Sequence, residues 1–157
     1  MLAESKDLKT VPQGRVLGVD YGEKRIGCAL SDPMQMLASP LITLNYLGPK
    51  QIFRELRRII KEQNVVAMVI GMPFHLNGRI GDKATQVKEF AEHAKTRLTV
   101  PVYLWDERWT TVNAEKSMQA RGLSPSKHRD RIDQVAAAFI LQGFLDRLSN
   151  SRALVSG

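Results

Sequence analysis

The chain has 157 residues, of which 43% are hydrophobic and 25% charged, a balance typical of one globular domain. No apolar run approaches the ~20 residues that a membrane-spanning helix needs, so a membrane protein of that kind is excluded. Lys and Arg outnumber Asp and Glu by 23 to 16, and the net charge of +7 suits a polyanionic partner such as nucleic acid. The single cysteine, Cys28, cannot form an internal disulfide, and we expect it to be buried in a cytoplasmic protein.

The first part of the chain predicts a strand meander. Residues 1–14 are expected to be a flexible lead-in. The nearly continuous apolar run at 15–20 predicts a central strand that is buried on both faces. The short link 21–25 implies an antiparallel hairpin with a second strand at 26–31. A third strand is predicted near 40–45.

Helices and strands alternate in the rest of the chain, as the change in hydrophobic period indicates. The predicted elements are a helix at 50–63, a strand at 65–70, a helix at 83–97, a strand at 100–105, a helix near 110–120 and a helix at 130–148. A loop at 121–129 separates the last two helices, and residues 149–157 are expected to be a flexible tail. The folded domain is therefore expected to span 15–148.

This order predicts an α/β fold with a five-stranded mixed sheet and helices on both faces. The strands at 15–20, 65–70 and 100–105 should be parallel, because each pair is joined through a helix. Functional groups in such sheets gather at the carboxyl ends of the parallel strands. Asp20 and Glu107 stand at two of these ends.

A third carboxylate, Asp133, lies in the first turns of the last predicted helix and could join Asp20 and Glu107 at this edge. Each acid also has a structural interpretation: Asp20 as a turn former, Glu107 as a solvated loop residue and Asp133 as a partner of the helix dipole. Three clustered carboxylates would repel one another unless a cation joined them. Two Mg²⁺ or Mn²⁺ ions would resolve the repulsion and could cleave a phosphodiester. The pattern therefore predicts a metal-dependent nuclease.

Two neighbouring acids leave alternatives open. Asp106 adjoins Glu107, and adjacent side chains in an extended strand point to opposite faces, so only one of the two should reach the metals. Asp130 lies three residues before Asp133 and could share its helical face as a fourth ligand, or it could cap the helix. Periodicity alone does not decide either question.

Four segments occur in an order and spacing that match a known family. They are VLGVDYGEKRIGCALSD at 16–32, VVAMVIGMPFHLNG at 65–78, WDERWTTVNAE at 105–115 and DRIDQVAAAFILQ at 130–142. With these motifs the chain resembles the YqgF (RuvX) family, a small group similar to Holliday junction resolvases. The resemblance covers 15–148 and implies a three-layer RNase H-like fold.

The resemblance also implies a function and a set of metal ligands. The family is taken to process the 5′ end of the 16S rRNA precursor in the bacterial cytoplasm, which would make precursor RNA and ribosomal particles the partners. Resolution of branched DNA is the alternative substrate class. By motif position, Asp20, Glu107 and Asp133 become the catalytic metal ligands, so that Glu107 is favoured over Asp106, and the role of Asp130 stays open.

Basic and polar residues around the acids are predicted to contact nucleic acid. They are Arg25, Arg108, Asn77, Lys127 and Arg129. Asn77 belongs to a loop at the predicted rim, and the last two belong to a basic stretch beside the final helix. For the first two arginines, a structural salt bridge is an equal alternative.

Two other function classes compete with the nuclease. The actin and sugar-kinase superfamily also begins with a strand, an Asp and a Gly, but its members need two such domains and a longer chain. A non-catalytic RNase H-like module could bind RNA or protein with the same fold, although such a module has no need of all three acids. The sequence is compatible with a monomer or a weak homodimer, and cutting a symmetric junction would require the dimer.

Overall fold

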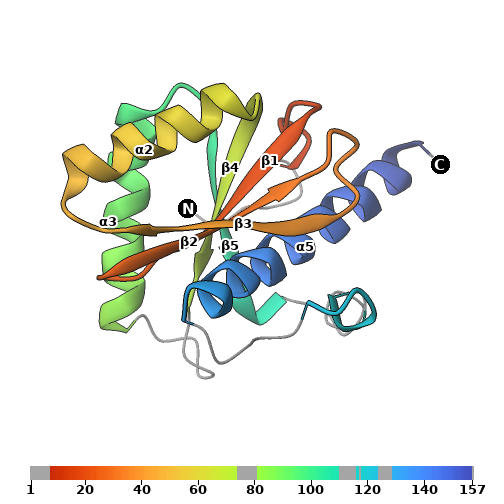
Figure 1. Ribbon diagram of the computed structural model, residues 1–157. Coiled ribbons are helices and arrows are strands. Elements are labelled where there is room, and N and C mark those ends of the chain that lie inside the picture. The colour runs from red at the N-terminus through yellow and green to blue at the C-terminus, as the bar shows by residue number, and fades with distance from the viewer. Residues whose placement is uncertain (1–7, 74–80, 110–115, 117, 124–128, 157) are drawn as a thin grey trace.

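A five-stranded sheet forms the centre of the protein in a computed structural model that describes residues 8–73, 81–109, 116, 118–123 and 129–156 (Figure 1). The elements are β1 (Arg15–Asp20), β2 (Arg25–Ser31), β3 (Ala38–Asn45), α2 (Pro49–Glu62), β4 (Val65–Met72), α3 (Asp82–Arg97), β5 (Val102–Asp106), the 3₁₀ turn η1 (Glu107–Trp109) and α5 (Arg129–Ser156). Within these residues no helix has the length and apolar character to cross a membrane.

The strand order is β3-β2-β1-β4-β5, with β1 at the centre. β1 pairs antiparallel with β2 and parallel with β4, and β4 pairs parallel with β5. The prediction of a mixed sheet with three parallel strands is therefore confirmed. The carboxyl ends of β1, β4 and β5 meet at one edge, where the acidic residues were expected.

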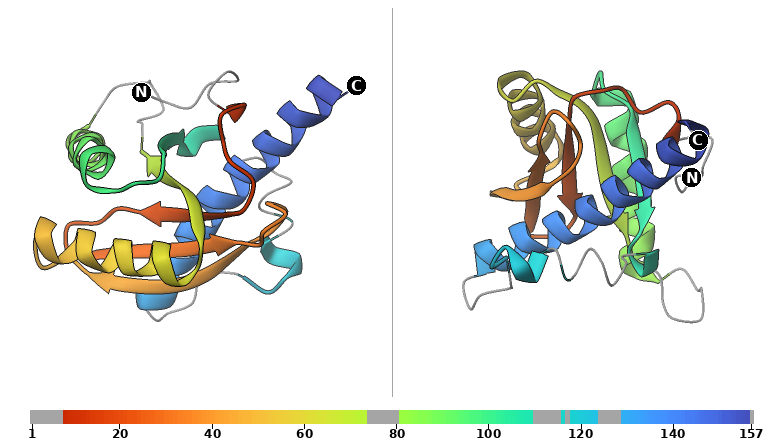
Figure 2. Two further views of the ribbon diagram at one scale, coloured as in Figure 1. Left: turned by 90° about the horizontal axis from the view of Figure 1, so that it is seen from above. Right: turned by 90° about the vertical axis from the view of Figure 1, so that its right-hand side faces the viewer.

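Helices cover both faces of the sheet, as predicted (Figure 2). On one face, α2 and α3 pack over Leu17 and Ile26 of the sheet, with Phe53 and Phe90 as the large helical residues. On the other face, α5 crosses β1, β2 and β3 (Figures 1 and 2). β1 is apolar on both sides because each side faces a hydrophobic layer. Cys28 is buried in the first of these layers, as expected.

The structure differs from the expected bounds of the folded domain at both ends. α5 continues to Ser156, beyond the predicted end at 148. Arg152 explains the extension, because its guanidinium donates to Gln35 Oε1 at 2.6 Å and to the carbonyl oxygen of Val11 at 3.2 Å. Leu8 and Val11 are buried in the α5 layer, so the end of the expected lead-in is part of the core. These contacts join distant parts of the chain and leave no local sequence pattern.

Candidate active site

Asp20 and Asp133 are brought together by the packing of α5 on β2. Asp20 is the last residue of β1, and its partner in the antiparallel ladder is Gly27 of β2. A Cβ atom on Gly27 would collide with the backbone carbonyl of Asp133. Glycine is therefore needed here for α5 to lie directly on the strand. This close approach places Asp133 beside the end of β1.

Glu107 approaches from the other side of β1. It follows the last residue of β5, and a Cβ atom built on Gly71 of β4 would lie 3.1 Å from its Oε1. Gly71 is the residue after Ile70, which pairs with Val19 immediately before Asp20. The Glu107 carboxylate thus lies over the end of β4, next to Asp20. The three predicted acids thus lie at the same edge of the sheet and come from β1, η1 and α5.

The electrostatics of Asp20 reflect this convergence. Burial raises the pKa of Asp20 to about 6, Lys83 opposes the rise, and Glu107 and Asp133 add to it. Burial also raises the pKa of Glu107, again against the opposing charge of Lys83 and with a smaller contribution from Asp106. Carboxylates whose ionised forms are disfavoured by burial and by each other gain from a nearby cation.

The side chain of Asp106 has a different environment from that of Glu107 and points toward Arg108. Its side chain is fully buried and accepts hydrogen bonds from Arg108, with Nη2 to Oδ2 at 2.6 Å and Nε to Oδ1 at 3.0 Å. The backbone N–H of Arg108 also donates to Oδ1 at 2.9 Å. Asp106 therefore holds Arg108, while Glu107 is the member of the pair that faces Asp20. The expected alternation along an extended strand does not apply, because β5 ends at Asp106 and Glu107 begins the 3₁₀ turn η1.

Arg25 is likewise engaged by an acid. Its Nε donates to Asp133 Oδ2 at 2.9 Å, and both side chains are partly buried. In the structure, Arg25 and Arg108 each form a salt bridge, as the structural interpretation of these arginines predicted. Their contact with nucleic acid stays a prediction.

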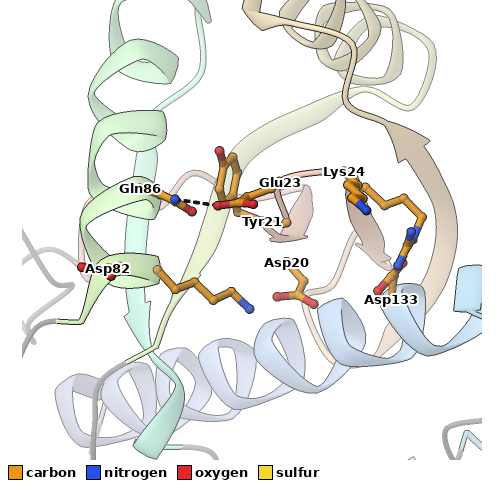
Figure 3. Close-up of a pocket in the computed structure, with 10 residues that line it drawn as sticks. Asp20, Tyr21, Glu23, Lys24, Asp82, Gln86 and Asp133 are labelled. Atoms are coloured by element: carbon orange, nitrogen blue, oxygen red, sulfur yellow. Dashed lines mark hydrogen bonds and ion pairs between the residues drawn. The ribbon is translucent and has the colours of Figure 1, made fainter.

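A pocket of about 540 Å³ opens in front of Asp20 (Figure 3). Its lining comes from the end of β1, the turn into β2, the start of α3 and α5: Asp20, Tyr21, Gly22, Glu23, Lys24, Arg25, Asp82, Lys83, Gln86 and Asp133. Asp20 lies between Gln86 on the α3 side and Asp133 on the α5 side (Figure 3). Gln86 Nε2 donates to Glu23 Oε1 at 2.7 Å, which ties α3 to the β1–β2 turn.

The sequence did not identify the α3 residues of this pocket. Lys83 and Gln86 are one turn apart at the start of an ordinary amphipathic helix, where polar residues usually face solvent. The order of the elements could have indicated these residues. Because α3 begins shortly after the carboxyl end of β4, its first turn lies near the sheet edge that carries Asp20.

The donor chemistry of the three acids fits a hard divalent cation, which prefers carboxylate oxygen. Among the described residues, however, no group of three or more His, Cys, Asp or Glu side chains lies close enough to hold a metal as the side chains stand. The ion pair of Asp133 with Arg25 occupies one of the carboxylates. Metal binding would therefore require the acidic side chains to rearrange.

Several predicted site residues fall outside the part of the chain that the structure describes. Asn77 and Lys127 belong to this group. Arg129 and Asp130 begin α5, but their side chains are not among those described. Whether Asp130 is a ligand or a helix cap thus stays open.

Comparison with known families gives a match over almost the whole chain. Residues 14–147 match the family model described as "RuvX: Holliday junction resolvase". A protein of Roseiflexus sp. (strain RS-1), named for pre-16S rRNA nuclease activity, is 44% identical over 133 residues, which cover 85% of this chain and 94% of the relative. A protein of Clostridium novyi (strain NT) with the same name is 40% identical and is covered to 99%.

Solved structures add a likeness of fold. RuvC of Thermus thermophilus in complex with a Holliday junction substrate matches 87% of this chain and 96% of that chain, with a TM-score of 0.57 and 16% identity. A second Thermus thermophilus RuvC structure gives a TM-score of 0.53 at 15% identity, over 86% of this chain and 96% of that one. The RNase H-like α/β fold expected from the sequence is therefore confirmed.

Proposed function

Because the chain belongs to the RuvX family over residues 14–147, we propose that it is a metal-dependent nuclease that cleaves the 5′ region of the 16S rRNA precursor. The observation that carries this function is the convergence of Asp20, Glu107 and Asp133 at the carboxyl edge of the parallel strands, beside an open pocket. The substrate class rests on the names of the relatives that are 40–44% identical. We place the reaction in the cytoplasm, with ribosomal particles as carriers of the RNA.

Asp20, Glu107 and Asp133 would hold Mg²⁺ or Mn²⁺, two ions being the arrangement that suits phosphodiester cleavage. When bound, such ions activate water and stabilise the leaving oxygen. Asp20 occupies the central position, and a cation favours its ionised form against the raised pKa. Gly71 leaves room for the Glu107 carboxylate to reach the same point.

Arg25 connects metal binding to substrate binding in this proposal. Its guanidinium neutralises Asp133 in the present arrangement. Once Asp133 turns to a cation, Arg25 is available for a phosphate oxygen, for which a guanidinium has suitable geometry. Arg108, Asn77, Lys127 and Arg129 are proposed as further contacts to the RNA backbone. Cleavage of a single RNA strand needs one protomer, so a monomer suffices for this reaction.

Cleavage of branched DNA is the second candidate. It is favoured by the description of the family that matches the chain, a Holliday junction resolvase. Two protomers would then have to act on the two symmetric strands of one junction, which makes a homodimer part of this alternative.

The nuclease proposal is tested with an acid variant that keeps the size of the side chain. Wild type, Asp20→Asn and the surface control Glu92→Gln are incubated with a 5′-extended 16S precursor transcript and with a four-way DNA junction, in Mg²⁺, Mn²⁺ or EDTA. We expect wild type and Glu92→Gln to cleave the transcript only with metal. Asp20→Asn should be slower by roughly 10²-fold or more, on the scale of losing one electrostatic contact in a catalytic site.

Equal cleavage by wild type and Asp20→Asn would contradict the proposal. Cleavage of the junction without cleavage of the transcript would replace it by the second candidate. Thermal unfolding of each variant, followed by circular dichroism, shows that the proteins compared are folded.

A further inference from the structure

Lys83 at the start of α3 has a position that the family motifs do not account for. It is the second residue of the helix and lines the same pocket as Asp20 and Asp133. The hydrogen bond of Gln86 with Glu23 holds this end of α3 against the β1–β2 turn. Lys83 and Gln86 both line the pocket, and Gln86 points from α3 toward Glu23 (Figure 3).

Two acids respond to the charge of Lys83. It is the largest favourable charge acting on Asp20, and also on Glu107, in both cases lowering a pKa that burial raises. Its charge thus acts on the acids contributed by β1 and η1, and its side chain lines the same pocket as Asp20. Asp133, the third acid, has Arg25 as its cation instead.

Lys83 differs from the two arginines of the site in its bonding. Arg25 is ion-paired to Asp133, and Arg108 to Asp106. Among the described residues, Lys83 takes part in no ion pair within 4.0 Å and no hydrogen bond of its side chain, and it is exposed. A lysine near two carboxylates but bonded to neither keeps its three N–H donors for another anion.

We propose that Lys83 contacts a non-bridging oxygen of the RNA phosphate that lies against Asp20 during cleavage. This inference rests on the proposed nuclease function and names a contact to its substrate. A phosphate entering the pocket meets carboxylates of the lining, Asp20 and Asp133 among them, and physiological salt screens such repulsion only beyond ~8 Å. A compact ammonium on the pocket wall offsets that repulsion where it is greatest.

The direct test measures RNA binding separately from cleavage. A fluorescein-labelled RNA oligonucleotide with the sequence of the 5′-extended 16S precursor is titrated, in EDTA, with four proteins that all carry Asp20→Asn. One has no further change, and the others add Lys83→Met, Lys83→Arg or Lys88→Met. Lys88 is an exposed lysine of the same helix that does not line the pocket, which makes it a matched control for the loss of one charge.

We expect Lys83→Met to weaken RNA binding roughly ten- to hundredfold, the usual effect of removing a hydrogen bond to a charged group. The slope of log affinity against log salt should decrease by ~0.7, because one phosphate contact is lost on single-stranded RNA. Lys83→Arg should restore much of the affinity, and Lys88→Met should change it little. In the background with Asp20 intact, Lys83→Met should lower kcat/KM for the same RNA by a similar factor.

Equal affinity and equal salt slope for Lys83→Met and Lys88→Met would overturn the inference. A loss of kcat with unchanged affinity and slope would also overturn it, since that result fits an effect on the acids alone. Failure of the nuclease proposal has a different signature, namely cleavage that is unaffected by Asp20→Asn. Because Lys83 is exposed, the substitutions should leave thermal stability close to that of the parent.

Discussion

Asp20 illustrates at the scale of one residue how a proposed catalytic position costs stability. Its pKa is raised to about 6 from 3.8, mainly by burial. The folded protein then binds this proton more tightly than the unfolded chain does. Above pH 6 the ionised carboxylate therefore lowers the free energy of unfolding, by up to ~3 kcal/mol. The cost shrinks as the pH falls from about 6 and is lost below 3.8, where both states are protonated.

This cost predicts that Asp20→Asn stabilises the metal-free protein at neutral pH. In EDTA at pH 7.5, the variant should unfold at a higher urea concentration than wild type, with a gain of ~1–3 kcal/mol. At pH 4.5 the gain should shrink, because wild type is then largely protonated at Asp20. Glu92→Gln, which changes an exposed carboxylate, should show no such trend. If the difference in free energy of unfolding between Asp20→Asn and wild type does not depend on pH, the raised pKa of Asp20 is contradicted.

Single residues also show where sequence reasoning reached its limit within the site. The strand ends located Asp20 and Glu107, because apolar runs mark buried strands reliably. Periodicity could not separate Asp106 from Glu107, since the choice depends on the buried contact between Asp106 and Arg108. Lys83 was missed because a charged residue in the first turn of a helix has the same local pattern whether it faces solvent or a pocket.

At the scale of elements, the site depends on how closely α5 lies on β2. Gly27 permits that contact, because any Cβ atom there would overlap the carbonyl of Asp133. The Arg25–Asp133 ion pair lies in the same place and joins the strand to the helix. The close approach at Gly27 therefore helps to set the position of Asp133 relative to Asp20.

Gly27→Ala should consequently impair both folding stability and activity. The methyl group forces α5 away from β2, and overpacking of this kind costs ~1–3 kcal/mol. Displacement of Asp133 should also lower the rate at which the precursor transcript is cleaved. This loss should persist at a temperature where the variant is fully folded, so that unfolding does not explain it. Urea unfolding and initial cleavage rates provide the two measurements.

Gly122→Asn is the control for that substitution. Gly122 has a φ of 72°, which Asn tolerates better than most residues, and no atom lies within 4 Å of a Cβ built there. A Gly27→Ala protein with the stability and activity of the control would show that α5 does not depend on this contact.

Element order was largely predictable from the sequence, whereas the end of α5 was not. The short link after β1 implied the hairpin, and the helical connections implied the parallel strands. The extension of α5 depends on Arg152 reaching Val11 and Gln35, which are more than a hundred residues away in sequence. Local patterns carry no information about such contacts.

At the scale of the whole molecule, a basic chain carries a pocket in which acidic and basic side chains lie together. The net charge is +7, and the pocket contains Asp20 and Asp133 beside Arg25 and Lys83. A nuclease needs both features, because basic groups attract the polyanion while carboxylates hold the metal. Family membership, fold and this distribution of charge agree on one assignment, and they disfavour the two-domain kinase class and a module without catalysis.

The central claim is that Asp20, Glu107 and Asp133 form one metal site. The most direct measurement is Mn²⁺ binding by isothermal titration calorimetry to wild type, Asp20→Asn, Glu107→Gln and Asp133→Asn, with Glu92→Gln as control. Wild type and the control should bind Mn²⁺ with the same affinity, and each of the three site variants should bind it at least ~10-fold more weakly. If any one of the three binds Mn²⁺ as wild type does, that residue is not a ligand and the three-carboxylate site is contradicted.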